Sequence, residues 1–425
     1  MNQEKTTERH AQEKYIRYNI AMTKTAGKER GVPGVTHLAI FTSCGTSLLT
    51  NTSPNDRDLL NNYANMTEKE VETDSQIKDQ LSCLIEFAAE KLKAADKAEA
   101  RKLSAEINTL SRLENQGKPY DLSPKNWTHY LLHSDTYLGK KMADCIKEWL
   151  RLQEYCDVQV VPIKDLRIDK DCFRQGLGNL ARVCVETMQP YQNDPTTHVV
   201  CNVTGGFKVL ESFLQIAAML YADESVYTFQ GVDELIRVPR LPVELNLEKA
   251  VPTDKAKMAL RQLKRRDTAS INEFDLEGLA DLAYEVVDNI VSITPWGEFL
   301  FAPLKEEYSK NLLDPISQRL ELMESFKNDC KAIDANTKRL VNEAIDRLSS
   351  AIDDCKGDLS QLSNLNSLDM KQCKVKTGTL WEFDIGASGK PYRGFGVPAS
   401  GGRFIVEHLG EHADRHISEW AASHR

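Results

Sequence analysis

Residues 201–208 combine a backbone turn with polar side chains in a pattern suited to binding an anion. The segment Cys201-Asn202-Val203-Thr204-Gly205-Gly206-Phe207-Lys208 follows the apolar run 198–200, which predicts a buried strand, and precedes the apolar run 209–220, which predicts a helix. Glycine lets the backbone approach a ligand closely, and the first amides of a helix attract negative charge. The asparagine, threonine and lysine of the segment suit phosphate or ribose. A tight turn without a ligand has the same two glycines, so companion loops are needed to decide.

Two earlier segments repeat this pattern of strand followed by turn. The predicted strand 35–42 runs into Ser43-Cys44-Gly45-Thr46-Ser47-Leu48-Leu49, and the predicted strand 129–133 runs into Ser134-Asp135-Thr136. In an open parallel sheet such turns meet at the carboxyl edge, where ligands bind. Helix capping is the alternative role of these hydroxyl groups. The predicted ligand-binding residues are Thr42, Ser43, Gly45, Thr46, Ser47, Ser134, Asp135, Thr136, Asn202, Thr204, Gly205, Gly206, Phe207 and Lys208.

The end of the chain carries groups suited to acid–base chemistry. Four of the nine histidines lie in the last 18 residues, and histidine exchanges a proton near neutral pH. Cleavage of RNA by its own 2′-hydroxyl needs a base, an acid and cations around the phosphate; it needs no metal or other cofactor. The predicted catalytic residues are Lys374, Lys376, Arg393, Arg403, His408 and His412.

Several roles within this catalytic set stay open. We choose His412 as the general acid, whereas His408, Glu407 and the lysines are all candidates for the base. The two arginines are alternatively ordinary charges of surface hairpins. A metal site formed by His408, His412 and His416 is a further alternative, which requires a helix where the sequence begins as a strand.

The elements that must position these residues fall into four parts. Strands alternate with helices over about 200 residues, which predicts an α/β domain with a doubly wound, mostly parallel sheet at 34–240. Residues 66–115 are predicted to form a charged helical hairpin inserted into this domain. The hairpin is either a solvated structural element or a docking element for a partner. Residues 1–33 are predicted to form an N-terminal arm.

The second half of the chain has a different pattern. Residues 241–310 are predicted to form a helical, winged-helix-like linker, with a basic helix at 253–267, an amphipathic helix at 272–290 and a short strand near 294–301. Residues 311–425 predict an α+β domain in the order strand, two helices, then three antiparallel strands joined by glycine-containing turns.

Composition limits the class of protein. A chain of 425 residues is too long for one ordinary core, and 41% hydrophobic with 28% charged residues is typical of a globular protein. No apolar run approaches the ~20 residues that cross a bilayer. The ten cysteines lack a Cys-x-x-Cys pair and predict reduced thiols in a cytoplasmic protein. A net charge of −9 argues against bulk electrostatic coating of nucleic acid.

The three loops together resemble the signature of CARF domains, the Rossmann-like sensors of CRISPR systems. The segments Ser43–Leu49, Ser134–Thr136 and Asn202–Lys208 occur in the order found in that family, and the resemblance covers nearly all of residues 34–240. It implies a homodimer formed through the CARF domains, with a cyclic oligoadenylate lying across its two-fold axis. Cyclic tetra-adenylate is the expected allosteric activator.

The C-terminal part resembles the RelE family of mRNA interferase toxins. The matching features are the lysine segment 371–376, the strand 378–385, the pair Tyr392-Arg393 and a last strand that ends at His412. The chain departs from the family where Asp384 and Ile385 occupy the region of a further arginine, and where a late tyrosine is absent. The resemblance implies RNA binding and cleavage of mRNA on the ribosome.

These features together predict a cytoplasmic, ribosome-dependent endoribonuclease of type III CRISPR antiviral defence. Cyclic oligoadenylate would activate this hydrolase, and cleavage of mRNA would inhibit translation. The alternative hypothesis is a CARF-controlled transcription regulator that binds DNA through the 241–310 linker. Alanine at Arg393 or His412 distinguishes them, because it silences a nuclease and leaves a regulator active.

Overall fold

The chain forms two compact units. The computed structural model describes residues 34–116, 120–167, 173–206, 208–228, 234–266, 269–364, 368–372, 380–387 and 391–411. The first unit extends to Glu244 and the second begins at Leu245. The predicted arm at 1–33 lies outside the described residues. None of the helices in these described ranges is long and apolar enough to cross a membrane.

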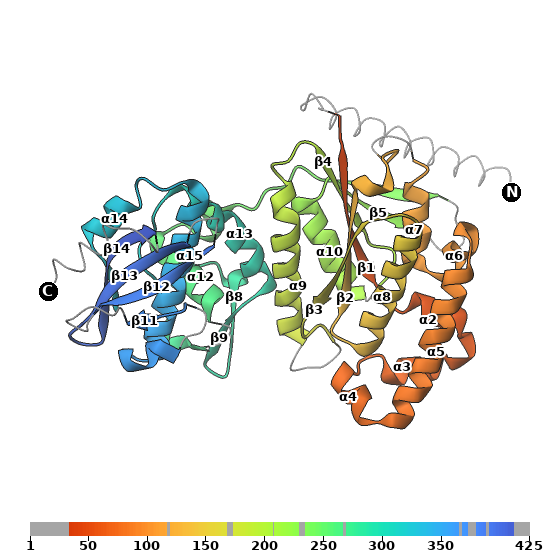
Figure 1. Ribbon diagram of the computed structural model, residues 1–425, viewed down its shortest axis with the longest axis horizontal. Coiled ribbons are helices and arrows are strands. Elements are labelled where there is room, and N and C mark those ends of the chain that lie inside the picture. The colour runs from red at the N-terminus through yellow and green to blue at the C-terminus, as the bar shows by residue number, and fades with distance from the viewer. Residues whose placement is uncertain are drawn as a thin grey trace, which may run out of the picture. The chain divides into compact units, whose positions relative to one another are not determined.

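A six-stranded sheet forms the centre of the first unit (Figure 1). The strand order is β3-β2-β1-β4-β5-β6, in which β1 to β5 are parallel and β6 is antiparallel. This confirms the prediction of an α/β fold with a mostly parallel sheet. The strands are β1 (His37–Cys44), β2 (Trp127–Ser134), β3 (Asp157–Ile163), β4 (Thr197–Asn202), β5 (Glu224–Thr228) and β6 (Leu235–Pro239).

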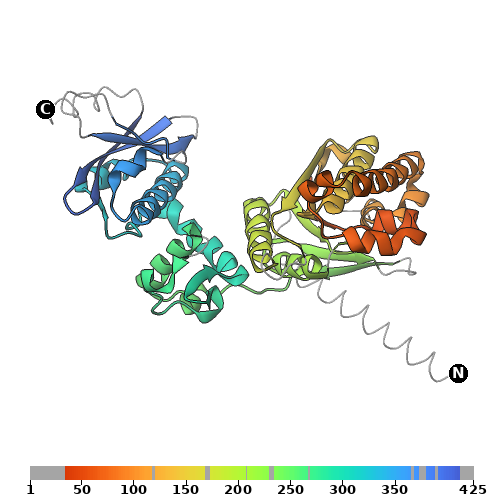
Figure 2. The ribbon, with the colours of Figure 1, turned by 90° about the horizontal axis from the view of Figure 1, so that it is seen from below.

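Helices cover both faces of this sheet (Figures 1 and 2). The helices that follow β2, β3 and β4 are α8 (Tyr137–Leu152), α9 (Phe173–Met188) and α10 (Lys208–Tyr221). Helices α9 and α10 pack against each other on one side, and α8 lies on the other. Burial on both faces explains the continuous apolar runs of the central strands: all residues of β1 after the first are buried.

The described part of the segment between β1 and β2 forms six α-helices, and several of its apolar residues belong to the core. Leu81, Ile85, Ala88 and Leu92 recur at helical spacing on one side of α5 and join the hydrophobic cluster of the sheet. Helix α7 packs directly on β1, β4 and β5. The helices are α2 (Ser47–Thr52), α3 (Arg57–Tyr63), α4 (Glu68–Thr73), α5 (Ser75–Ala94), α6 (Lys97–Leu103) and α7 (Ala105–Leu113).

The first part of the second unit contains a small sheet with the order β7-β9-β8. Its elements are α11 (Leu247–Ala250), α12 (Asp254–Arg265), β7 (Ala269–Ser270), β8 (Tyr284–Val287), β9 (Ile290–Ile293) and α13 (Pro295–Lys310). Helix α12 lies within the range 253–267 of the predicted basic helix.

Two sequence-based predictions in this region are wrong. The predicted helix at 272–290 is replaced by the hairpin of β8 and β9, whose turn Asp288-Asn289 has positive φ at both residues. This is the turn geometry that two-residue hairpins favour. The predicted strand near 294–301 is instead the start of α13, because Thr294 accepts a hydrogen bond from the amide of Gly297 and Pro295 occupies the first turn.

The second unit ends in a five-stranded sheet with the order β10-β14-β13-β12-β11. Strand β10 is parallel to β14, and β11 to β14 are antiparallel. This order agrees with the prediction of a strand, two helices and three antiparallel strands, except that the short β11 adds a fourth antiparallel strand in the described part of the chain. The elements are β10 (Leu320–Leu322), α14 (Glu324–Asp329), α15 (Ala335–Asp354), β11 (Lys371–Gln372), β12 (Trp381–Ala387), β13 (Pro391–Ala399) and β14 (Arg403–Glu411).

Candidate functional site

Two glycine loops meet where the strand order of the large sheet reverses. Strands β1 and β4 are parallel neighbours, with Thr42 opposite Asn202, and each is followed by a glycine turn. A Cβ added to Gly45 would lie 2.8 Å from the Cα of Gly206, so the two backbones are in contact. Gly206 also has a φ of +115°, which side chains disfavour. This is the position in an open α/β sheet where ligands bind.

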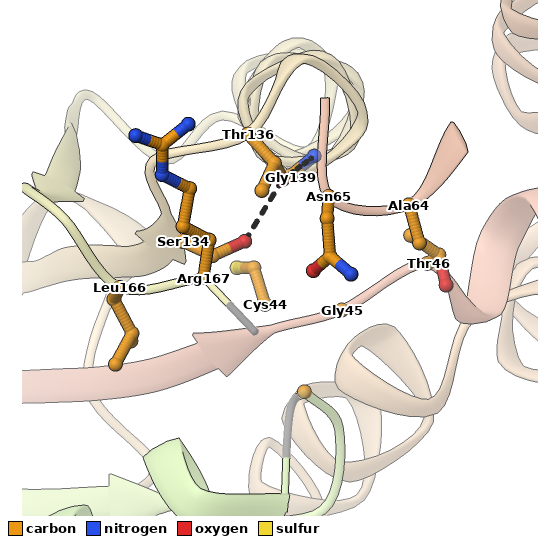
Figure 3. Close-up of a pocket in the computed structure, with 11 residues that line it drawn as sticks. Cys44, Gly45, Thr46, Ala64, Asn65, Ser134, Thr136, Gly139, Leu166 and Arg167 are labelled. Carbon is orange, nitrogen blue, oxygen red and sulfur yellow. Dashed lines mark hydrogen bonds between the residues drawn. The ribbon is translucent and has the colours of Figure 1, made fainter. Parts of the chain in front are cut away.

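A pocket of about 180 Å³ opens beside the two loops (Figure 3). In Figure 3, Ser134, Thr136 and Arg167 lie on one side of it, Thr46 and Asn65 lie on the other, and Cys44 lies between them. Of the predicted ligand-binding residues, the lining includes Gly45, Thr46, Ser134, Thr136 and Gly206. The lining residues that sequence analysis missed are Cys44, Ala64, Asn65, Gly139, Leu166 and Arg167.

Arg167 provides positive charge at this pocket. It follows β3, and its Nη1 lies 3.9 Å from Oε2 of Glu70. A guanidinium group suits a phosphate because it presents several donors in a planar fork. A signal was present in the sequence, since Arg167 follows the apolar residues Val158, Val160 and Val161 by a few positions.

The loop after β2 combines a cap with an anion-attracting helix end. Thr136 caps α8 by accepting a hydrogen bond from the amide of Gly139 at 3.1 Å, and its hydroxyl lies 3.0 Å from that of Ser134. The amino end of this 16-residue helix faces the pocket, which favours negative charge there. Asp135 points elsewhere, since its carboxylate accepts from the amide of Asp165.

Three of the predicted ligand-binding side chains are buried within the protein. Thr42, Ser43 and Asn202 have no exposed surface. The hydroxyl of Ser43 donates to the carbonyl oxygens of Asn202 and Gly205, and the side-chain oxygen of Asn202 accepts from the amide of Thr204. These groups therefore shape the two loops, and they do not line the pocket.

Three further predicted residues lie on the other side of the loops, next to α7. Ser47, Thr204 and Lys208 line a separate groove of about 730 Å³. Its other polar and charged lining residues are Asn51, Arg101, Lys102, Asn108, Arg112, Tyr227 and Thr228. Phe207 lies outside the described residues.

The loop of Ser47 is held by a carboxylate that sequence analysis missed. Glu106 of α7 is fully buried, and it accepts hydrogen bonds from the amide of Gly45 at 2.8 Å and from the hydroxyl of Ser47 at 2.6 Å. From the sequence, an acidic residue in the first turn of a helix predicts only a capping role. Its partners distant in the chain are set by the tertiary fold.

In the second unit, the structure places three of the six predicted catalytic residues. Arg393 lies on β13 opposite Gly410, and His408 lies on β14 opposite Phe395. Arg403 begins β14, beside the turn, so seven positions separate it from Gly410. At ~3.4 Å per residue that is about 24 Å, which places Arg403 and Arg393 at opposite ends of the hairpin. Lys374, Lys376 and His412 lie outside the described residues.

Each placed catalytic candidate has a carboxylate partner. His408 Nδ1 lies 2.9 Å from Oδ2 of Asp329, which also accepts from the amide of Leu409. The guanidinium of Arg393 donates to Asp369 at 3.3 Å, and a hydrogen bond from the nearby Lys371 contributes to a lowered pKa of that acid. Arg403 pairs with Glu321 across 3.6 Å.

Basic residues of the linker form ion pairs with carboxylates of the second unit. Lys264 contacts Glu298 at 2.5 Å, where both side chains are largely buried. Arg266 contacts Glu273 at 2.8 Å and Asp354 at 2.6 Å. These charges therefore contribute to packing of the second unit.

Comparison with known protein families gives one further observation. Residues 101–241 match the model of a family described as a CRISPR-associated protein (Cas_APE2256). The match supports the prediction that this is a CRISPR-associated protein. It spans α6 to β6 and includes the loops after β2 and β4, whereas the loop after β1 precedes it. No curated protein matches the chain.

Proposed function

We propose that the chain is a cyclic oligoadenylate-activated, ribosome-dependent mRNA endoribonuclease of type III CRISPR defence. The observation that carries the proposal is the position of the pocket at Gly45, Ser134, Thr136 and Gly206. It lies at the reversal of strand order, within a sheet whose larger part matches a CRISPR-associated family. The resemblance of the loops to CARF domains adds the ligand class.

The size and charge of the pocket support a ligand shared by two copies. A volume of about 180 Å³ is below the ~300–1,000 Å³ of pockets that enclose a whole drug-sized ligand. One copy therefore has room for a phosphate or part of a nucleotide. A cyclic tetranucleotide has matching two-fold symmetry and engages the same groups of both copies of a homodimer. Arg167 and the amino end of α8 stabilise its phosphates.

The second unit would perform the chemistry. A base removes the proton of the 2′-hydroxyl, the 2′-oxygen attacks the adjacent phosphorus, and the 5′-oxygen of the next nucleotide leaves with a proton from an acid. The products are a 2′,3′-cyclic phosphate and a 5′-hydroxyl. His408, oriented by Asp329, is a base candidate, and Arg393 stabilises the negative charge of the pentavalent phosphate. His412 remains the proposed acid.

Activation requires the ring to favour one arrangement of the dimer. A ligand shifts an equilibrium only by its difference in affinity for the two states, and a change from 1:99 to 99:1 needs a preference of about 5.5 kcal/mol. The ring meets this requirement if several of its phosphates gain contacts only in the active dimer.

The test is cleavage of a defined mRNA in a translation extract, with and without cyclic tetra-adenylate, and in a parallel reaction lacking ribosomes. We expect cleavage only with both the ring and ribosomes, and loss of cleavage in Arg393→Ala. Intact mRNA under every condition refutes the nuclease. In that case, ring-dependent binding of duplex DNA would favour the transcription regulator, although Lys264 and Arg266 are already ion-paired.

A further inference from the structure

The first ligand loop already holds a negative charge that belongs to the chain itself. The carboxylate of Glu106 accepts from the amide of Gly45 at 2.8 Å, from the hydroxyl of Ser47 at 2.6 Å and from the hydroxyl of Ser104 at 2.6 Å. The Gly45 amide and the Ser47 hydroxyl are donors of the type that would bind a phosphate in a loop after a parallel strand. Glu106 therefore occupies an anion position.

The surroundings of Glu106 make this a costly arrangement. The residue has no exposed surface, and among the described residues no lysine or arginine forms an ion pair with it. Burial disfavours a charged carboxylate that has no cationic partner. The chain has also made room for it: a Cβ on Gly205 would lie 2.3 Å from the carboxylate oxygen. A side chain at residue 205 would therefore push against the Glu106 carboxylate, which gives this glycine a structural role.

Helix α7 connects this carboxylate to both ligand loops. The backbone carbonyl of Glu106 accepts from the side-chain amide of Asn202 at 3.2 Å. One turn further along, the hydroxyl of Thr109 lies 2.6 Å from that of Thr204. A displacement of Glu106 from the first loop would therefore change the contacts of α7 with the second.

A place for the displaced carboxylate lies next to it. The groove of about 730 Å³ is lined by Ser47, whose hydroxyl donates to Glu106, and by Ala105, which precedes Glu106 in the chain. Its cations are Arg101, Lys102, Arg112 and Lys208. Opposite charges attract more strongly at a partly buried site than in water, so this groove is suited to receive a carboxylate.

We propose that Glu106 is an internal anion that a phosphate of the ligand displaces from Gly45 and Ser47, so that ring binding loosens α7 from the sheet together with α6, which packs on α7. This rests on the proposed ring-binding function and adds a regulatory role for the insertion. Glu106 competes with the ring for these donors and so lowers the affinity for the ring. Its displacement by the ring in turn changes how the insertion packs on the sheet.

The experiment compares the full-length protein with Glu106→Gln, using cyclic tetra-adenylate as the probe. Glutamine keeps the size and hydrogen-bonding reach of the side chain and removes its charge. The matched control is Glu99→Gln, the same change at an exposed position of α6. Calorimetry gives the affinities, and hydrogen–deuterium exchange of residues 97–113 reports the loosening of α6 and α7.

We expect Glu106→Gln to bind the ring at least about tenfold more tightly, a difference of about 1.4 kcal/mol, with Glu99→Gln unchanged. We also expect faster exchange of 97–113 in the parent protein when the ring is added. If the parent binds the ring, and Glu106→Gln binds no more tightly with exchange of 97–113 unaffected, Glu106 is only a structural clamp and the proposal is overturned. If neither protein binds the ring, the proposed function fails together with this inference.

Discussion

Replacing Arg261 with methionine should weaken the packing of α12 against α15 in the second unit. Arg261 of α12 contacts Asp346 of α15 through two hydrogen bonds, at 2.5 and 3.3 Å. It also donates to the carbonyl of Asp314 at 2.8 Å and lies over the ring of Tyr308, 5.6 Å from its centre. The hydroxyl of Tyr308 donates to Asp346. The cluster therefore joins α12, α13 and α15.

The expected magnitude follows from burial of the pair. The side chains of Arg261 and Asp346 are 5% and 0% exposed. Burial by itself would lower the pKa of Arg261, and the neighbouring Asp346 raises it, so the charged form is retained. Removing the arginine leaves Asp346 buried with a tyrosine donor and no cation. Breaking a buried pair in this way costs about 3–5 kcal/mol.

Hydrogen–deuterium exchange of α12 and α15 peptides measures this effect locally, which avoids assuming a single unfolding transition for a chain of two units. At 1.4 kcal/mol per factor of ten, amides that exchange through opening of the second unit should exchange about two to four orders of magnitude faster in Arg261→Met. Peptides of the first unit should be unchanged.

Two controls make the result specific to the buried pair. Lys255→Met removes a charge from the same helix, but Lys255 pairs with Asp275 and Glu277 in solvent, so exchange should change little. The double variant Arg261→Met/Asp346→Leu removes both charges and should recover most of the protection. Exchange in Arg261→Met as slow as in Lys255→Met would refute the reasoning.

Three further predictions concern other sites. Burial lowers the pKa of His129 to about 3, so between pH 6.5 and that value only the unfolded chain takes up the proton, and the free energy of unfolding falls by about 1.4 kcal/mol per pH unit. In the urea-induced unfolding transition of the first unit, the free energy of unfolding of His129→Phe should therefore fall by about 2 kcal/mol less than that of the parent between pH 7 and pH 5, and parallel curves would contradict this. Asp329→Asn should slow RNA cleavage at least about tenfold, because His408 loses its charged partner, while calorimetry shows unchanged ring binding; an unchanged rate excludes a role for the pair. Arg167→Ala should weaken ring binding about ten- to hundredfold through lost charge-assisted hydrogen bonds, whereas Arg151→Ala on the exposed face of α8 should not, and equal affinities would place the ligand elsewhere.

Local patterns were enough to predict most elements. The alternation of apolar strands and helices in residues 34–240 led to the mostly parallel sheet, because burial on both faces demands continuous apolar runs. The two errors in the linker arose where local signals compete. Asp288-Asn289 interrupts a helical pattern with a hairpin turn, and Pro295 opens a helix although it looks like a breaker.

The candidate site was predictable in its location and only partly in its members. A turn after a parallel strand must lie at the carboxyl edge of the sheet, so Gly45, Ser134 and Gly206 were found from their positions in the sequence. The direction of each side chain depends on the strand pleat and on the packing of the loop. For that reason Ser43 and Asn202, although correctly placed in the chain, point into the protein.

The sequence by itself determined the order of the elements and the loops that meet at the edge of the sheet, because periodicity and turn chemistry act over a few residues. Only the tertiary structure decided which distant groups come together. Glu106 reaches Gly45 across 61 positions, Arg261 reaches Asp346 across 85, and the register of β13 and β14 separates Arg403 from Arg393. These contacts depend on how helices and strands pack, a property of the whole unit that no local pattern encodes.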